Sequence, residues 1–306
     1  MSRYYYYGWA GFSHTAINST YGIHRQNLVQ ASPVEGLLYE LKSDSDAYNK
    51  AVPHQTNAQG LRDKEYPLEK PANTFRVAVI GDSSTLPEGV KIENAYHSLL
   101  EERMNEEQDD VTYEFINFGV PGYDPTDYET VIRSKALAYN PDLVLVAFSP
   151  RNDYEPRPPL WKFKVYTEPL EDRFFQLYVL KLLREEFPIF GKNHLSPGWN
   201  KKIEFDADGQ YIAESFAAIA ATAKHHQVPV VLAVLDFIPT HKELRRIIQQ
   251  DAAAQGMHVV DLSDSFAGNH KKYWIYPTDS HPNAKANRIF AEVLYDFIVK
   301  EGLVKP

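Results

Sequence analysis

Short apolar runs alternate with longer amphipathic stretches along most of this chain. The short runs, such as VAVI at residues 77–80 and LVLVAF at residues 143–148, stop at turn-forming residues, as buried strands do. In the longer stretches, apolar residues recur at helical spacing. The pattern predicts strands at residues 75–80, 111–117, 143–148, 228–237 and 258–262, and helices at residues 94–104, 125–139, 211–226, 242–254 and 284–300.

Strands that alternate with helices of this length predict an α/β fold with three layers, α/β/α, around a central parallel sheet. Strands of such a sheet are buried on both faces, so they read as continuous apolar runs. Open sheets of this kind place their sites at the carboxyl ends of the strands. Polar residues that directly follow a predicted strand are therefore candidates for chemistry.

The predicted core does not begin at the start of the chain. Residues 1–73 contain scattered polar turns and end in a proline-bearing linker, so we expect an N-terminal extension packed on the core. Within it, the tyrosine run at residues 4–7 favours an edge strand over a sugar-stacking platform. The core then spans residues 74–306. It carries an insertion at about residues 154–207, where the alternation breaks, and this insertion is either a lid beside the site or a packed surface segment.

The most informative segment is RVAVIGDSST at residues 76–85. Its apolar run stops abruptly at Gly81, Asp82 and Ser83, so Ser83 is expected at a strand-to-helix turn. Backbone N–H groups are unpaired at such a turn and suit an acyl-transfer nucleophile. Glycine, aspartate and serine are also ordinary turn and cap residues, which leaves a purely structural interpretation open.

Three later segments favour the catalytic interpretation. EFINFGVPG at residues 114–122 is a strand that ends in asparagine and two glycines, and PDLVLVAFSPRND at residues 141–153 is a strand that ends near Asn152. TDSHPNAKANRIFAEVL, from residue 278 onward, carries His281 just ahead of the last helix. Serine, glycine, asparagine and histidine in this order resemble the SGNH hydrolase superfamily, also called GDSL-type esterases and lipases.

The resemblance implies a role for each matching position. Ser83 matches the nucleophile, and Gly122, five residues after the asparagine that ends its strand, matches the oxyanion-hole glycine better than Gly119 does. Asn152 matches the oxyanion asparagine, and His281 matches the catalytic base. The implied fold is the flavodoxin-like SGNH hydrolase fold, with an oxyanion hole made by the Ser83 and Gly122 N–H groups and the Asn152 amide.

The chain departs from the family pattern in two places. Pro150 stands where the family usually has glycine, which stiffens the loop before Asn152. Thr278 stands where the family commonly has its acid, so Asp279, two residues before His281, is the expected orienting acid. Each matching residue also has a structural interpretation: glycine and asparagine form turns, His281 can be a surface residue, and Asp279 can cap the last helix.

These residue types suit ester chemistry. A serine hydroxyl attacks an acyl carbon once an imidazole accepts its proton, and a carboxylate holds that imidazole in the right tautomer. We therefore expect a serine esterase, a carboxylic ester hydrolase acting on acetyl or short-chain esters of small molecules or carbohydrates. Two alternatives stay open: an O-acyltransferase to a carbohydrate hydroxyl, and a noncatalytic carbohydrate-binding relative.

The amino-acid composition argues against several kinds of partner and active site. Among 306 residues, 43% are hydrophobic and 24% charged, an ordinary globular profile, and the net charge of −9 argues against nucleic acid as a partner. There is no cysteine, which excludes disulfides, thiolate metal sites and a cysteine nucleophile. We expect no cofactor, no metal and no transmembrane segment. The first residues lack a signal-peptide pattern, and a trimmed signal segment would favour an extracytoplasmic location; the sequence determines neither localisation nor oligomeric state.

Overall fold

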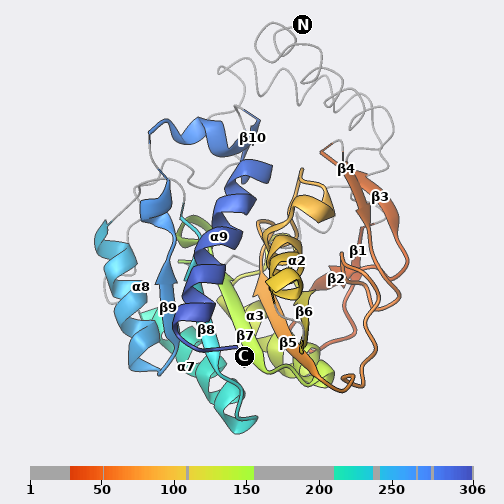
Figure 1. Ribbon diagram of the computed structural model, residues 1–306, viewed down its shortest axis with the longest axis horizontal. Helices are drawn as coiled ribbons and strands as arrows, with labels where there is room; N and C mark the ends of the chain where they lie inside the picture. Colours follow the sequence, from red (N-terminus) through yellow and green to blue (C-terminus); the bar gives the residue numbers. More distant parts are fainter. Residues whose placement is uncertain are drawn as a thin grey trace, which may run out of the picture.

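The computed structural model describes residues 28–50, 52–107, 110–154, 210–236, 242–266, 268–276 and 279–304. Five parallel strands form the central sheet, in the order β6-β5-β7-β8-β9 (Figure 1). Counted along the core, this is the doubly wound order 2-1-3-4-5. The predicted α/β fold with a central parallel sheet is confirmed. The strands are β5 (Thr74–Gly81), β6 (Thr112–Asn117), β7 (Leu143–Phe148), β8 (Val230–Val234) and β9 (His258–Asp261).

Helices cover both faces of this sheet, because its strands present apolar side chains on both sides. On one face, α2 (Tyr96–Glu107) and α9 (Ala284–Lys300) pack side by side against the sheet (Figure 1). On the other face lie α3 (Pro125–Ser134), α7 (Gln210–His225) and α8 (Lys242–Ala254). The two apolar clusters are therefore separated by the sheet, which gives the three layers.

Shorter elements join this core. The short helical turns are η1 (Ile92–Asn94), η2 (Ala136–Tyr139), α4 (Pro150–Asp153), η4 (Ser263–Ser265) and η5 (His270–Tyr273). Before α9 the chain forms a two-stranded antiparallel ribbon of β10 (Trp274–Tyr276) and β11 (Asp279–Pro282). The N-terminal part adds two more antiparallel ribbons, β1 (Val29–Ala31) with β2 (Tyr39–Leu41) and β3 (Asp46–Asn49) with β4 (Val52–Gln55).

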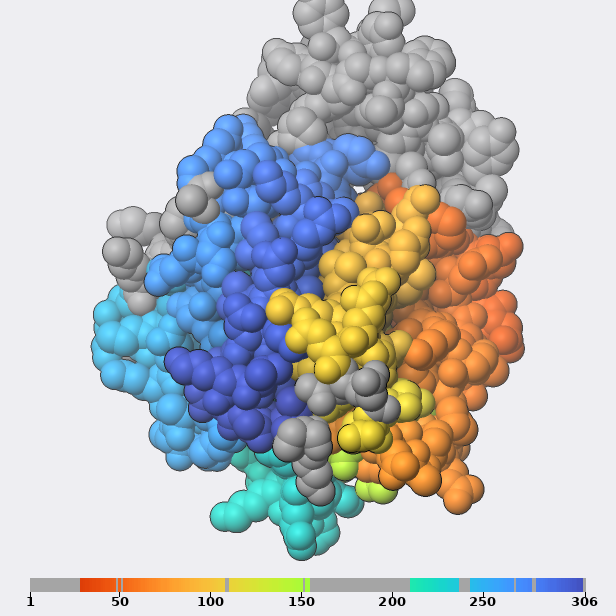
Figure 2. Space-filling view, in the orientation of Figure 1, coloured from red at the N-terminus to blue at the C-terminus, as the bar shows by residue number. Residues whose placement is uncertain are grey.

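The described part of the N-terminal extension packs closely on the core. Figure 2 shows residues of the extension, in red to orange, beside the gold α2. Tyr39 is buried, its hydroxyl donates to the Pro121 carbonyl at 2.6 Å, and its ring packs at a tilt against that of Tyr123, with centroids 5.5 Å apart. In return the Tyr123 hydroxyl donates to the Tyr39 carbonyl. This contact joins β2 to the loop after β6.

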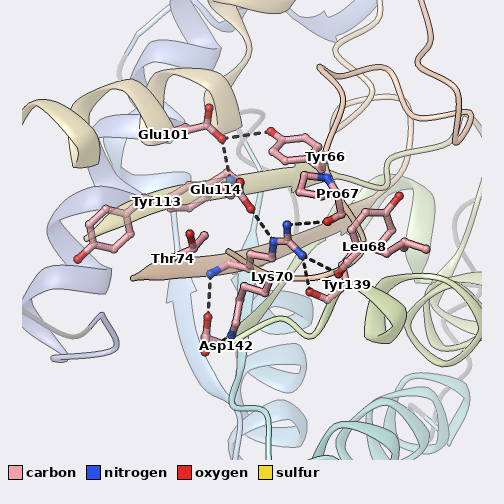
Figure 3. A network of polar contacts seen from close by, with 12 residues as sticks. Tyr66, Pro67, Leu68, Lys70, Thr74, Glu101, Tyr113, Glu114, Tyr139 and Asp142 are labelled. Atoms are coloured by element: carbon pink, nitrogen blue, oxygen red, sulfur yellow. Dashed lines mark hydrogen bonds and ion pairs between the residues drawn. The ribbon is translucent and has the colours of Figure 1, made fainter. Parts of the chain in front are cut away.

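A second contact fastens the linker to the opposite end of the sheet (Figure 3). Arg76 on β5 is fully buried, and its guanidinium pairs with Glu114 on β6 at 2.5 Å. The same group donates to the carbonyls of Pro67 and Leu68 in the linker and of Tyr139. A buried guanidinium needs acceptors for all its donors, so this cluster holds the linker at one position on the sheet.

The described elements differ from the predicted ones mainly at their ends. The helix expected near residues 94–104 begins at Tyr96, and the one expected at 125–139 stops at Ser134 and continues as the η2 turn. Asn140 then ends that turn in the left-handed conformation, with φ of 52°. The tyrosine run at residues 4–7 and nearly all of the expected insertion at 154–207 lie outside the described residues.

Candidate active site

The order of strands reverses between β5 and β7, where ligands bind in open α/β sheets. Ser83 follows β5 and Asn152 follows β7, and these two strands pair directly, with Gly81 opposite Ala147. The Asn152 side-chain amide donates to Asp82 at 2.7 Å. The sheet therefore brings the serine turn and the asparagine together, although they are far apart in sequence.

Local hydrogen bonds shape the turn that holds Ser83. The Asp82 carbonyl accepts from the N–H groups of Thr85 and Leu86, and the Asp82 carboxylate accepts from the Ser84 N–H at 2.8 Å. Gly81 is required just before the turn, because a Cβ there would lie 2.1 Å from the Thr85 Oγ1 atom. After this turn come the short η1 turn and then α2, which begins at Tyr96, close to the expected start at residue 94.

The β10–β11 ribbon places His281 against this turn. The His281 Nε2 atom lies 2.8 Å from the Ser83 hydroxyl, across 198 positions of sequence. Its Nδ1 atom lies 2.5 Å from the Asp279 Oδ1 atom, which also accepts from the His281 backbone N–H at 3.1 Å. When Nδ1 carries the proton and donates it to Asp279, Nε2 keeps a lone pair directed at Ser83, as a general base needs.

Asp279 is held as a carboxylate. Burial would raise the pKa of Asp279, but the hydrogen bond and charge of His281, together with the charge of Lys50, outweigh burial. The pKa of Asp279 therefore lies well below its usual value. The cap of the last helix is Asn283 and not Asp279, since the Asn283 side chain accepts from the N–H groups at the start of α9.

Two backbone N–H groups, in the loops after β5 and β6, are candidate donors. After β6 the chain runs beside the end of β5, with the Val120 N–H donating to the Gly81 carbonyl at 3.1 Å, and then reaches Gly122, which has φ of 80°. Within the described residues, no protein acceptor is recorded for the N–H groups of Ser83 and Gly122. The Gly119 N–H is occupied by the Asn117 side chain at 2.8 Å. Gly122 is therefore better suited than Gly119 to bind a substrate oxygen.

Pro150 fits the local structure without a glycine. It is the first residue of the short helix α4, where proline is favoured because its missing N–H has no partner to lose. The Ser149 N–H before it donates to the buried Asp153 carboxylate at 2.7 Å. This turn presents Asn152 toward Asp82.

Two residues at the site were not predicted from the sequence. Lys50, from the turn between β3 and β4, places its ammonium 2.8 Å from the Asp279 Oδ2 atom and 2.9 Å from the His281 Nδ1 atom. Glu88 lies in the long turn after Ser83, with its carboxylate 3.6 Å from the His281 Nε2 atom. Neither belongs to a motif, and the only signal was the presence of charged residues in predicted turns.

Among the residues that the structure describes, no group of three or more histidine, aspartate or glutamate side chains is arranged to hold a metal ion. Within the same residues, no helix is both long and apolar enough to cross a membrane.

Comparison with known proteins assigns the class. The model of the GDSL-like lipase/acylhydrolase family matches residues 79–289, well over half of the chain. The protein is thus an α/β enzyme of the carboxylic ester hydrolase class, and it belongs to the GDSL-like lipase/acylhydrolase family. No curated protein matches the sequence.

Several solved structures are similar to this chain at low sequence identity. TesA aligns with 75% of this chain and 99% of its own, with a TM-score of 0.50 at 14% identity. The two-domain esterase CEX, described as active on acetylated mannans, has a TM-score of 0.49 at 14% identity over 74% of this chain. This chain spans only 49% of the CEX chain, about half its length. The esterase EstA from Pseudoalteromonas sp. has a TM-score of 0.46 at 16% identity, covering 75% of this chain and 98% of EstA. The likeness to TesA, at so low an identity, shows the fold alone.

Proposed function

We propose that this protein hydrolyses acetyl or other short-chain acyl esters with a triad of Ser83, His281 and Asp279. The observation that carries the proposal is the continuous series of contacts from the Ser83 hydroxyl through both ring nitrogens of His281 to the Asp279 carboxylate. Hydroxyl, imidazole and carboxylate in this order are the groups that nucleophilic acyl transfer requires.

The reaction follows from these roles. As the Ser83 oxygen bonds to the acyl carbon, His281 takes the hydroxyl proton and later gives it to the leaving alcohol. Water then attacks the acyl-serine while His281 accepts its proton, and His281 returns that proton to the Ser83 oxygen as the acyl–oxygen bond breaks and the carboxylic acid leaves. In both steps the carbonyl oxygen becomes negative, and the N–H groups of Ser83 and Gly122 with the Asn152 amide serve as its donors. Each such donor contributes on the order of 100- to 1000-fold in turnover in a known serine hydrolase.

For this role, the Asn152 amide needs a hydrogen that can bind the substrate oxygen without a change of side-chain conformation. Its Nδ2 atom carries two hydrogens, and the bond to Asp82 uses one of them. That bond fixes the direction of the amide, so the second hydrogen remains as an oriented donor. A donor held in advance costs no reorganisation when charge develops.

O-Acetylated carbohydrate is the substrate class that we propose to test first, on the family resemblance. The acidic surface expected from a net charge of −9 fits a neutral acylated sugar better than a polyanionic one. Acetylated oligosaccharides therefore serve as substrates beside simple p-nitrophenyl esters. Capture of the acyl group by an added sugar, in place of water, would indicate transfer instead of hydrolysis.

The experiment measures hydrolysis of p-nitrophenyl acetate, butyrate and octanoate by the parent and three variants. Ser83→Ala and His281→Ala are expected to abolish turnover, because they remove the nucleophile and the base. Ser84→Ala is the matched control, since it removes the neighbouring hydroxyl and leaves the triad intact. Full activity in Ser83→Ala, or an equal loss in Ser84→Ala, would refute the proposed site.

A further inference from the structure

Lys50 is an unusual residue to find beside a catalytic histidine, because a buried ammonium is costly unless acceptors surround it. Its side chain is 10% exposed, and its Nζ atom lies 2.6 Å from the Glu88 carboxylate and 2.8 Å from that of Asp279. The Lys50 carbonyl also accepts from the Tyr276 hydroxyl on β10 at 3.2 Å. Lys50 is thus tied both to the serine turn and to the ribbon that carries His281.

Glu88 is equally well fixed. Its side chain is 1% exposed, and its backbone N–H donates to the Ser83 carbonyl at 3.0 Å. Arg62, also from the extension, donates to the carbonyls of Leu86, Pro87 and Val90 on either side of Glu88, at 2.6 to 2.7 Å. A rigid turn therefore presents the Glu88 carboxylate to Lys50.

Close packing around Gly89 fixes the serine turn and the neighbouring elements relative to one another. Gly89 has φ of 74°, and a Cβ at this position would lie 2.8 Å from the Ile275 side chain on β10 and 3.5 Å from the Lys50 Cβ atom. The serine turn, the β3–β4 turn and the β10–β11 ribbon meet at this point, so the position of Lys50 is determined by all three.

We propose that Lys50 is a positioning residue of the active site: through the Asp279 Oδ2 atom it holds the triad acid, and together with Glu88 it sets the charge that His281 experiences. The inference rests on the triad proposed above. It gives the N-terminal extension a part in the site, because Lys50 belongs to the extension and lies 231 positions before His281 in the sequence.

The Nδ1 atom of His281 can make only one hydrogen bond in the ring plane, yet two partners are within reach. If it donates to Asp279, Nε2 is free to accept the serine proton. If instead it accepts from Lys50, the ring proton sits on Nε2 and the histidine cannot act as a base. The carboxylates of Glu88 and Asp279 give Lys50 two better acceptors, which leaves Nδ1 to Asp279.

Charge at the site is balanced by the same three groups. The charged groups in contact with His281 are Asp279 on its own strand, Glu88 from the serine turn and Lys50 from the extension. Tyr276 contacts Lys50 through the Lys50 carbonyl, and Arg62 acts on the turn of Glu88. Two carboxylates favour protonation of His281, and the single ammonium opposes it.

Removing one charge at a time should therefore move the pH profile in opposite directions. The acid limb of kcat/KM reports protonation of the base in the free enzyme. In Lys50→Met this limb should move about one pH unit upward, and in Glu88→Gln about one unit downward, as expected for a charge within ~4–6 Å. The double variant loses both charges, so its limb should return close to that of the parent.

The experiment records kcat/KM for a p-nitrophenyl ester from pH 4 to pH 9, with the unfolding temperature of every variant. Lys70→Met is the matched control: Lys70 is another extension lysine, paired with Asp142 at 2.7 Å at the opposite end of the sheet (Figure 3). It should leave the acid limb unmoved.

The outcomes separate this inference from the proposed function. Suppose that activity depends on Ser83 but the acid limb of the kcat/KM profile lies at the same pH in Lys50→Met, Glu88→Gln and the parent. Lys50 then has only a structural role and the inference is wrong. Shifts in the same direction would also overturn it. If activity does not depend on Ser83, the proposed triad itself fails.

Discussion

Replacing Asp279 with asparagine tests the chemistry of the site most directly. The two carboxylate oxygens have different duties: Oδ1 accepts from both the ring and the backbone of His281, and Oδ2 accepts from Lys50. An asparagine offers one oxygen and one NH₂ group in the same space. If the oxygen faces His281, the NH₂ group meets the Lys50 ammonium, donor against donor. If the amide turns over, its NH₂ group faces Nδ1 and selects the wrong tautomer.

The loss should be large but incomplete. In a well-studied serine protease, the same exchange lowers kcat about 10⁴-fold through the wrong tautomer. Here one orientation of the amide keeps the correct tautomer at the cost of the Lys50 contact, so we expect a loss of about 10³-fold. That loss corresponds to about 4 kcal/mol of transition-state stabilisation. Activity should remain above that of Ser83→Ala, because the nucleophile and the oxyanion donors are still present.

The assay compares kcat and kcat/KM for p-nitrophenyl acetate in the parent, Asp279→Asn and the same change combined with Lys50→Met. Lys50→Met should lower the activity of the parent, because it releases the acid. In the Asp279→Asn background it should raise activity, because it removes the donor that opposes the correct amide orientation. A parent and Asp279→Asn variant that agree within about threefold would remove Asp279 from the triad. If Lys50→Met changes activity in the same direction in the parent and in the Asp279→Asn background, the proposed conflict between the Lys50 ammonium and the asparagine NH₂ group is refuted.

Two further predictions concern stability. Arg76→Met should cost about 3–5 kcal/mol in the free energy of unfolding, because it leaves Glu114 without its buried partner and frees the linker. Denaturant unfolding measures this loss. The control is Arg103→Met, which should cost less than about 1 kcal/mol because the pair of Arg103 with Glu107 lies on the surface. Equal losses in the two variants would contradict the role of the buried cluster. Burial raises the pKa of Asp63 from 3.8 to about 7, so its protonated form stabilises the fold below pH 3.8 and this contribution disappears as pH rises through about 7. Asp63→Asn cannot ionise, so between these pH values its unfolding temperature should rise relative to that of the parent, and a constant difference across the range would show that Asp63 does not titrate there.

Much of the fold was readable from the chain. Largely apolar runs predicted all five strands of the sheet, because a parallel strand is buried on both faces and most of its positions need apolar residues. The strand at 143–148 and the helix at 242–254 have the predicted bounds, whereas the helix expected from residue 94 starts at Tyr96, whose backbone N–H donates to the Asn287 side chain on α9 at 3.1 Å. Such bonds depend on neighbours that a local pattern does not contain.

For the site, the sequence supplied the residue types and their positions after strands. Ser83 and Asn152 could be expected near each other, because adjacent parallel strands end at the same edge. Their approach to His281 depends on the β10–β11 ribbon, which gave no distinct signal in the pattern.

Lys50 and Glu88 show what only the tertiary structure decided. Neither position has the periodicity or motif by which a sequence identifies a functional residue, and each lies in a polar turn where charge is common. Their importance comes from burial and from contacts across long separations, 231 positions between Lys50 and His281. Local preferences and apolar periodicity are encoded residue by residue, so the chain alone determined the sheet and the candidate catalytic side chains at its edge. Electrostatic partners are determined by which distant surfaces pack together, and that was decided by the folded extension.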